Sequence, residues 1–273
     1  MKLECEIKNR HNRGVTVGKP LVDIKPIGYG GAFATHEGHS SFLVSDMVSK
    51  KNLLIDCGSL IYKRLRETFL SDQIDAIYIT HTHEDHIGSL SSLIYENWFV
   101  HKRKLVIFCH DNVRCKLTEY LITVCNHEYN QFDMPYYREE VLENLFPSFS
   151  LSDFNTTSFH FPNFPTAGLM LDVKSKGEVF KVIFSGDLGV PVWSVICEKG
   201  DLIFQDAGTY KFTEGHHLAI PHAYYEDCDQ ENVYLYHHFK EDVDIINKNC
   251  NHAQSISEIV NKGELIQIQF KEQ

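Results

Sequence analysis

Apolar and polar residues alternate along the chain in a way that predicts a mixture of strands and helices. Short apolar runs bounded by polar residues are typical of strands, and longer amphipathic stretches are typical of helices. Strands are expected at 24–27, 41–44, 53–55, 74–80, 104–109, 158–161, 169–173, 180–184, 202–205, 233–236 and 265–270. Helices are expected at 61–70, from 85 toward 98, at 112–125 and at 138–145. This order favours an α/β protein in which sheets pack together and helices cover them outside.

The chain contains no internal repeat, low-complexity segment or Pro- or Gly-rich linker, so residues 1–273 are expected to form one domain. With 43% hydrophobic residues it can bury a substantial core. No apolar run is long enough to span a bilayer, so no membrane partner is expected. The first residues show no basic region followed by an apolar stretch, and none of the eight cysteines forms a Cys-x-x-Cys pair. These features favour a cytoplasmic protein with reduced thiols.

The formal net charge of −11 bears on the partners that the protein can bind. An acidic surface repels a long phosphate backbone unless a local basic patch overrides the repulsion. The densest basic stretch, residues 101–104, is short. Long nucleic acid is therefore not expected as a substrate.

Four side chains of metal-binding type follow the apolar run 74–80 within six residues: His81, His83, Asp85 and His86. Imidazole suits zinc, and carboxylate suits harder divalent metals. A loop that turns back on itself can direct the first two side chains to one side and the last two to the other. This spacing predicts a site for two neighbouring ions.

The pattern His-x-His-x-Asp-His resembles the signature of the metallo-β-lactamase superfamily. Residues 54–58 look like the family's strand that ends in an aspartate, here Asp56, whose role is to orient the histidine loop. Residues 28–31 look like its glycine-rich first hairpin, although these glycines alone would indicate an ordinary turn. The resemblance covers most of the chain and implies the family's fold, a four-layer αβ/βα sandwich.

Two further motifs follow in the family's order. Residues 185–189 are similar to the motif of the bridging aspartate, which implies that Asp187 holds two ions about 3.5–4 Å apart. His160 lies where the family has its third histidine motif, and the resemblance makes it a metal ligand. From its own segment alone, a histidine in an apolar strand is more typical of a buried core residue.

The last ligand is a choice between two adjacent histidines. The family's terminal motif places a histidine after an apolar strand at Leu-x-His, and this spacing selects His237. His238 is the competitor, because Phe239 after it also resembles part of the motif. The resemblance thus implies His81, His83 and His160 at one ion, Asp85, His86 and His237 at the other, and Asp187 between them.

The segment 201–207, followed by His222, resembles the phosphodiesterase branch of the superfamily, which includes ribonuclease Z and small cyclic-nucleotide phosphodiesterases. In that branch a histidine at this point stabilises the phosphate or protonates the leaving oxygen, which would make His222 catalytic. His216 and His217 are nearby alternatives. The chain departs from the pattern at Ala223, where the branch usually has Ser or Thr.

The resemblance implies two divalent ions, zinc by expectation, with manganese or iron as alternatives. Zinc lowers the pKa of bound water to about 7, so a hydroxide between the ions is expected to attack phosphorus. Asp85 could also orient this nucleophile, and His222 could protonate the leaving oxygen.

The substrate expected from these features is a small phosphodiester, most simply a cyclic nucleotide. The stretch 115–149 reads as two helices with acids and aromatics, unlike the basic arm with which ribonuclease Z grips transfer RNA. Phe132, Tyr136 and Tyr137 could stack a base or could simply be packing residues. Family resemblance suggests a homodimer. The alternatives are a ribonuclease Z-type nuclease, a lactonase or thioester hydrolase, and a di-iron redox protein.

Overall fold

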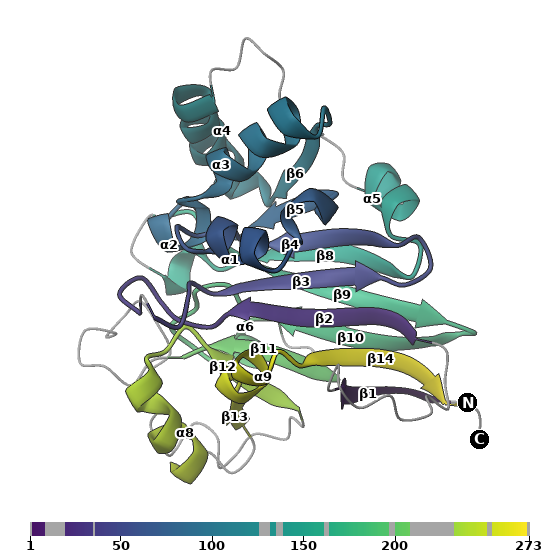
Figure 1. The fold of residues 1–273 in the computed structure, drawn as a ribbon. Helices are drawn as coiled ribbons and strands as arrows, with labels where there is room; N and C mark the ends of the chain where they lie inside the picture. The colour runs from purple at the N-terminus through teal and green to yellow at the C-terminus, as the bar shows by residue number, and fades with distance from the viewer. Residues whose placement is uncertain are drawn as a thin grey trace.

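A computed structural model describes residues 2–8, 20–34, 36–125, 132–134, 139–160, 164–196, 200–207, 232–249 and 253–271. Two mixed sheets lie one over the other in it (Figure 1). In spatial order the first sheet contains β1 (Lys2–Lys8), β14 (Leu265–Lys271), β2 (Pro20–Gly28), β3 (Ser41–Asp46), β4 (Lys51–Ile55), β5 (Ala76–Ile79), β6 (Leu105–Cys109) and β7 (Phe132–Asp133). The second contains β13 (Ala253–Ser255), β12 (Val233–Tyr236), β11 (Leu202–Asp206), β10 (Glu178–Phe184), β9 (Ala167–Ser175) and β8 (Phe149–Asn155).

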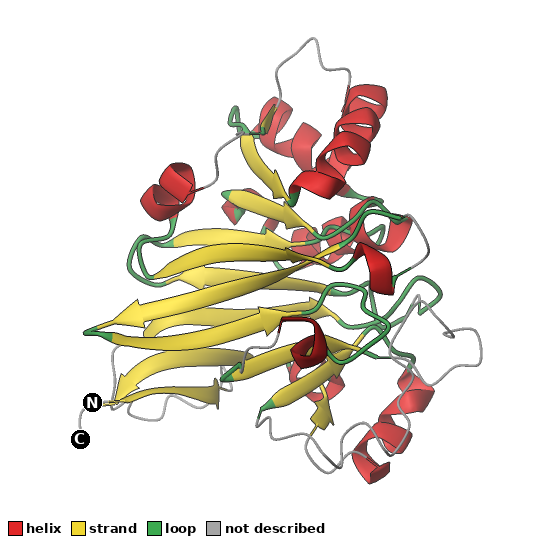
Figure 2. Cartoon of the chain, turned by 180° about the vertical axis from the view of Figure 1, so that it is seen from behind, coloured by secondary structure: helices red, strands yellow, loops and turns green. Residues whose placement is uncertain are grey.

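Helices lie outside the two sheets (Figure 2). They are α1 (Ile61–Glu67), α2 (Glu84–Ile87), α3 (Leu90–Tyr95), α4 (Asp111–Cys125), α5 (Glu139–Leu145), α6 (Val192–Ile196), α8 (Val243–Asn249) and α9 (Ser257–Lys262). Short 3-10 turns occupy Ser71–Gln73, Thr157–Phe159 and Lys240–Asp242, and a π-helical turn occupies Glu96–Val100. Among the described helices, none combines the length and the apolar character that crossing a bilayer requires.

Alternation along the strands produces the layers, because successive side chains of a strand point to opposite faces. On β5, Tyr78 faces a core cluster shared by both sheets, whereas Ile77 and Ile79 pack with the side chains of α1, α3 and α4. On β10, Val182 faces the shared cluster and Ile183 packs with side chains of α6 and α8. The arrangement is the four-layer αβ/βα sandwich of the metallo-β-lactamase fold that the sequence predicted.

The predicted strand at 158–161 is wrong. The strand lies earlier, as β8, and the chain then forms the 3-10 turn Thr157–Phe159. The side chain of Asn155 explains the ending, because its Oδ1 accepts the backbone N–H of Thr157 at 2.9 Å and turns the chain out of the sheet. His160 follows this turn in extended conformation.

Two sets of parallel strands determine where the loops meet. β4, β5 and β6 are parallel in the first sheet, and β10, β11 and β12 are parallel in the second. Carboxyl ends of parallel neighbours lie at one edge of a sheet, and loops there are where sites form on a rigid scaffold. The segments after β4, β5, β10, β11 and β12 carry the acidic and histidine residues singled out above.

Candidate metal centre

The histidine loop after β5 is held in place by Asp56, which follows β4 in left-handed conformation with a φ of 58°. One oxygen of this carboxylate accepts the backbone N–H of Thr80 at 2.8 Å. The other accepts the Thr80 hydroxyl at 2.7 Å and lies 2.8 Å from Nδ1 of His86. Gly58 lies so close to the loop that an added Cβ would be 1.8 Å from the carbonyl oxygen of Asp85. The loop conformation is therefore determined by the neighbouring strand.

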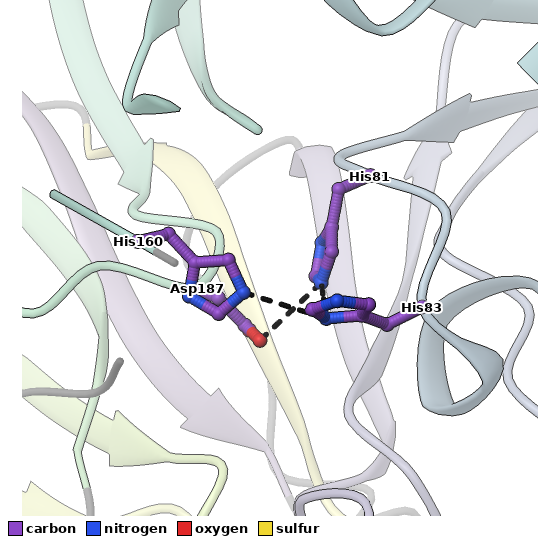
Figure 3. A group of neighbouring side chains, drawn as sticks. All are labelled: His81, His83, His160 and Asp187. Atoms are coloured by element: carbon purple, nitrogen blue, oxygen red, sulfur yellow. Dashed lines mark hydrogen bonds and ion pairs between the residues drawn. The ribbon is translucent and has the colours of Figure 1, made fainter. Parts of the chain in front are cut away.

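Three histidines and one aspartate converge in what we call the first ligand group: His81, His83, His160 and Asp187 (Figure 3). Nε2 of His81 lies 2.9 Å from Nδ1 of His83, and Nε2 of His160 lies 3.4 Å from the same atom. Oδ2 of Asp187 lies 3.4 Å from Nε2 of His81. Ligands in a tetrahedron around zinc are separated by roughly 3.3 Å, given Zn–N bonds of about 2.0–2.1 Å. The group therefore has the size of a metal site.

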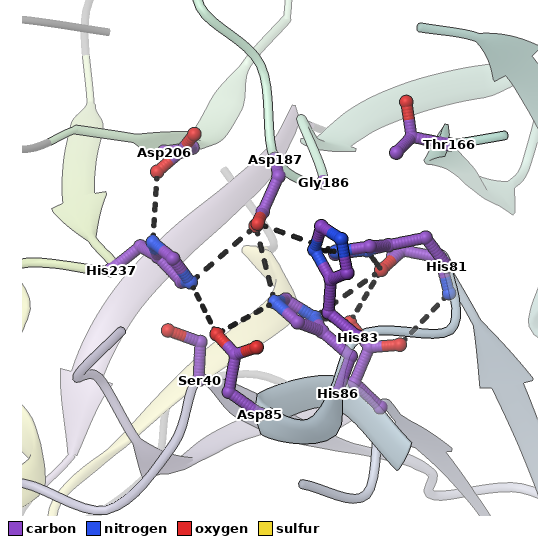
Figure 4. Close-up of polar contacts among 12 residues, drawn as sticks. Ser40, His81, His83, Asp85, His86, Thr166, Gly186, Asp187, Asp206 and His237 are labelled. Atoms are coloured by element: carbon purple, nitrogen blue, oxygen red, sulfur yellow. Dashed lines mark hydrogen bonds and ion pairs between the residues drawn. The ribbon is translucent and has the colours of Figure 1, made fainter. Parts of the chain in front are cut away.

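The second ligand group consists of Asp85, His86, Asp187 and His237, all of them buried (Figure 4). Oδ2 of Asp85 lies 2.9 Å from Nε2 of His237 and 3.3 Å from Nε2 of His86. Oδ1 of Asp187 lies 3.2 Å from Nε2 of His86 and 3.6 Å from Nε2 of His237. Asp187 thus offers one carboxylate oxygen to each group, which is the arrangement of a bridging ligand.

His237 is oriented from behind by Asp206, at the end of β11. Oδ1 of this fully buried carboxylate lies 3.4 Å from Nδ1 of His237, and Oδ2 accepts the backbone N–H of Leu188 at 2.8 Å. Asp206 was not among the predicted site residues. Its position, an acid directly at the end of an apolar strand, was the signal, since Asp56 and the histidine loop occupy equivalent positions.

The glycine-rich hairpin between β2 and β3 lies directly against the same ligand. The backbone N–H of His237, whose φ is 68°, donates to the carbonyl of Tyr29 at 2.6 Å. An added Cβ on Gly31 would stand 2.9 Å from Cε1 of the His237 ring, so the position has no room for a side chain. The glycines are therefore more than an ordinary turn: one of them makes space for a proposed ligand.

The competing histidine is engaged elsewhere. Nε2 of His238 lies 3.0 Å from the hydroxyl of Ser255, its Nδ1 lies 2.9 Å from the carbonyl of Phe239, and its ring packs against Tyr29. His238 belongs to neither ligand group. Other expected site residues, His222 with its alternatives His216 and His217, and Tyr136 and Tyr137, lie outside the described residues. Phe132 is 9% exposed and packs in the core, so it is a packing residue.

The charge balance of the two groups suits cations. Burial lowers the pKa of His81 well below its usual value and that of His83 to about 4, so both rings are neutral at pH 7 and carry lone pairs. Burial raises the pKa of a carboxyl, yet His86 and His237 outweigh it at Asp85 and hold that pKa well below its usual range. Lone pairs of uncharged imidazoles that converge beside buried carboxylates suit the binding of a cation between them.

The surroundings of His86 also favour a positive charge. Burial opposes a charge on its ring, but the carboxylates of Asp187, Asp85 and Asp56 raise its pKa well above the usual value. A proton therefore balances these carboxylates when no metal is bound, and a divalent cation would take its place. The donor set fits divalent metal binding.

Fold and centre together define a protein of the metallo-β-lactamase fold with a divalent metal centre. Solved structures share this architecture at low sequence identity. YhfI from Bacillus subtilis has 17% identity and a TM-score of 0.65, covering 86% of this chain and 95% of its own. Yeast PDE1 has 13% identity and a TM-score of 0.62, covering 91% and 100%. The short form of human tRNase Z has 20% identity and a TM-score of 0.57, covering 81% and 94%.

Sequence similarity defines a narrower family for this chain. The family model described as Anti-Pycsar protein Apyc1 matches residues 22–265, so the chain belongs to the Apyc1 family. It is 42% identical over 78 residues to Apyc1 of Bacillus phage BSP38 and 35% identical over 101 residues to Apyc1 of Paenibacillus harenae. These matched segments cover 28% and 36% of this chain, and 30% and 41% of the relatives' own lengths.

Proposed function

We propose that this protein is a binuclear metal-dependent phosphodiesterase that hydrolyses a small cyclic nucleotide. The observation that carries the proposal is the division of Asp187 between the two ligand groups, with one oxygen directed to each. Two ions held close together by one carboxylate are the arrangement that in-line displacement at phosphorus uses. Membership of the Anti-Pycsar Apyc1 family and a fold shared with yeast PDE1 support the proposal.

The ions that we assign to the centre are two zinc ions. The first ion would be held by His81, His83 and His160. The second ion would be held by Asp85, His86 and His237, and Asp187 would contact both ions. Four of these side chains come from one six-residue loop, and imidazole predominates in the first ligand group, which favours zinc over harder metals. Bound there, the ions would activate a water molecule and neutralise the charge that develops on the phosphoryl oxygens.

The chain's own residues then have distinct tasks. Asp56 and Asp206 hold the rings of His86 and His237 at the angle that the ligand groups require. Asp85 belongs to the second ligand group, and two imidazoles hold its carboxylate ionised, so it can also accept a hydrogen bond from the attacking water and orient it. His222, outside the described residues, is the proposed proton donor to the leaving oxygen.

The net charge of the chain bears on the size of its substrate. With a net charge of −11, every phosphate outside the metal centre meets an acidic protein, whereas a cyclic nucleotide carries a single phosphate that the ions neutralise. We therefore propose turnover of a cyclic mononucleotide and little processing of precursor transfer RNA.

The test is a substrate panel at matched metal and salt concentrations. It contains cyclic mononucleotides, a cyclic dinucleotide, precursor transfer RNA, a lactone and a thioester. We expect a linear nucleoside monophosphate from the cyclic mononucleotide, and no product when Asp187→Ala replaces the wild type. Efficient cleavage of transfer RNA with inert cyclic nucleotides would contradict the substrate, and cleavage of only the lactone or thioester would contradict the phosphodiesterase assignment.

The proposal also includes a single domain over residues 1–273, a homodimer and a cytoplasmic location. One core cluster with side chains from both sheets supports the single domain. The described cysteines Cys5, Cys57, Cys109, Cys115 and Cys125 take part in no disulfide bond, which is compatible with a reducing compartment. Analytical ultracentrifugation tests the dimer, for which we expect about twice the 31.5 kDa mass of the chain.

A further inference from the structure

The hairpin turn beside His237 presents a phenylalanine to solvent. Phe33 is 82% exposed, and exposure of a large apolar ring forgoes the stabilisation that burial would give. Single exposed apolar residues are ordinary on protein surfaces, so exposure alone indicates nothing. The position of this ring relative to the metal centre is what distinguishes it.

Backbone hydrogen bonds hold the turn against the centre. The N–H of Ala34 donates to the carbonyl of Gly31 at 3.0 Å, which closes a turn with Phe33 at its corner. At the base of the hairpin, the N–H of Gly30 donates to the carbonyl of Gly38 at 2.8 Å, and the N–H of Ser40 donates to that of Gly30 at 2.9 Å. The turn is therefore anchored on both sides.

Distance along the chain places Phe33 near the second ligand group. Gly31 lies in contact range of the His237 ring. Two residues of chain span at most about 7 Å, so Phe33 cannot be far from that contact. The connection between β2 and β3 and helix α2, which carries Asp85 and His86, lie at the same edge of the molecule (Figure 1).

The residues around Phe33 leave its ring uncovered. The local sequence is Gly-Gly-Ala-Phe-Ala, so every immediate neighbour is small. A nucleobase has an aromatic face and extends away from a phosphate by the length of the ribose. Stacking on an aromatic side chain needs no charge and tolerates any base.

We infer that Phe33 is a substrate-binding residue that stacks the nucleobase of the cyclic nucleotide while the metal centre holds its phosphate. This inference rests on the proposed function. It assigns base binding to the hairpin between β2 and β3 rather than to the region of Phe132, which packs in the core. It also accounts for an aromatic side chain at a turn that is otherwise built of glycine and alanine.

The test compares substrates with and without a base. Phe33→Ala, Phe33→Trp and the wild type are assayed with 3′,5′-cyclic mononucleotides and with abasic ribose 3′,5′-cyclic phosphate, and inorganic phosphate is used as a competitive inhibitor. Phe69→Ala is the matched control, because Phe69 is 81% exposed and lies between the end of α1 and the amino end of β5, away from the edge that carries the centre.

We expect Phe33→Ala to raise KM for the nucleotides by about 5- to 100-fold, the range that loss of one stacked base represents. kcat, turnover of the abasic substrate and inhibition by phosphate should stay at wild-type values. Phe33→Trp and Phe69→Ala should behave as wild type toward the nucleotides.

An unchanged KM in Phe33→Ala overturns the inference, and so does an equal loss with the abasic substrate. A change in sedimentation of Phe33→Ala, accompanied by equal losses on all substrates, would show instead that Phe33 is a contact between copies of the chain. A wild-type protein that is inert toward every phosphodiester would contradict the proposed function itself, which separates the two failures.

Discussion

At the scale of single residues, two histidines of the candidate metal centre are oriented by carboxylates that contact their Nδ1 atoms. Asp56 contacts Nδ1 of His86, and Asp206 contacts Nδ1 of His237, so the Nε2 atom of each ring is left for the second ligand group. A carboxylate at one ring nitrogen determines the tautomer and makes the other nitrogen a better metal ligand. The second ligand group is thus supported on both of its histidines.

We predict that Asp206→Asn weakens metal binding about 10- to 100-fold, the usual cost of losing such a partner. The amide keeps the volume, but with a single oxygen it cannot face both the N–H of Leu188 and Nδ1 of His237 with an oxygen. Titration against a competing chelator measures the affinity. Asp172→Asn is the control, since Asp172 pairs with Lys181 through its half-exposed carboxylate. An affinity equal to that of wild type would show that Asp206 does not orient His237.

The two adjacent histidines allow a second comparison. We predict that Asp187→Ala lowers metal affinity and activity more than about 10- to 100-fold. That range is the usual cost of losing a residue that only supports a ligand, whereas here both ligand groups lose an oxygen. His238→Ala should keep its metal and lose roughly 1–3 kcal/mol of stability, since the buried ring and its hydrogen bonds with Ser255 and with the carbonyl of Phe239 are lost. Elemental analysis and thermal denaturation distinguish the two. Metal loss in His238→Ala with metal retained in His237→Ala would reverse the assignment of the last ligand.

At the scale of elements, the centre is assembled where strand ends and a hairpin meet. β5 delivers the histidine loop, β10 delivers Asp187 and β12 delivers His237, each in the segment directly after the strand. The hairpin between β2 and β3 closes against His237 because Gly31 carries no side chain. Rigid strands therefore set the spacing of the ligands, and one close backbone contact holds the last of them.

We predict that Gly31→Ala displaces His237 and reduces metal bound at the second ligand group, because the new methyl group would stand 2.9 Å from the ring. The metal-to-protein ratio should fall toward one per chain. Gly177→Ala is the control: its φ of 85° strains any side chain, yet nothing lies within 4 Å of the added atom. That variant should lose some stability and keep all its metal. Equal metal contents in both variants would contradict the role of the hairpin.

At the scale of the whole molecule, the metal centre connects the two sheets. The histidine loop and Asp56 belong to the first sheet, whereas Asp187, Asp206 and His237 follow strands of the second. Because the ligand groups combine side chains from both, cations bound there would link the two sheets at this edge and neutralise several buried carboxylates. We therefore expect metal binding and folding to be coupled.

We predict that a chelator lowers the melting temperature of the wild type by about 10 °C, which corresponds to metal present at about 1,000 times its dissociation constant. Restoring zinc should restore the melting temperature. Asp187→Ala, already deficient in metal, should show little response to the same chelator. An identical melting temperature of wild type with and without metal, as measured by calorimetry, would show that the sheets do not depend on the centre.

The sequence by itself determined the layers and the local part of the site. Apolar runs marked β5 and β10, and alternation with a period of two marked β14. The histidine loop holds its four side chains within six residues, so no long-range information was needed to recognise it. His160 was a different case, because its expected strand is a 3-10 turn, and only the order of the motifs pointed to its place in the first ligand group.

The family resemblance placed Asp85 and His237 at one ion, but the physical reason that such distant residues meet lies in the tertiary structure. Asp85 and His237 are 152 positions apart, and their contact follows from sheet register and from packing between the two sheets, neither of which has a local signature. The same holds for Asp206 behind His237 and for Gly31 against its ring. Apolar periodicity predicts which face of an element is buried, but it does not predict which other element packs against that face. The candidate metal centre consists of side chains from elements that meet only through such packing.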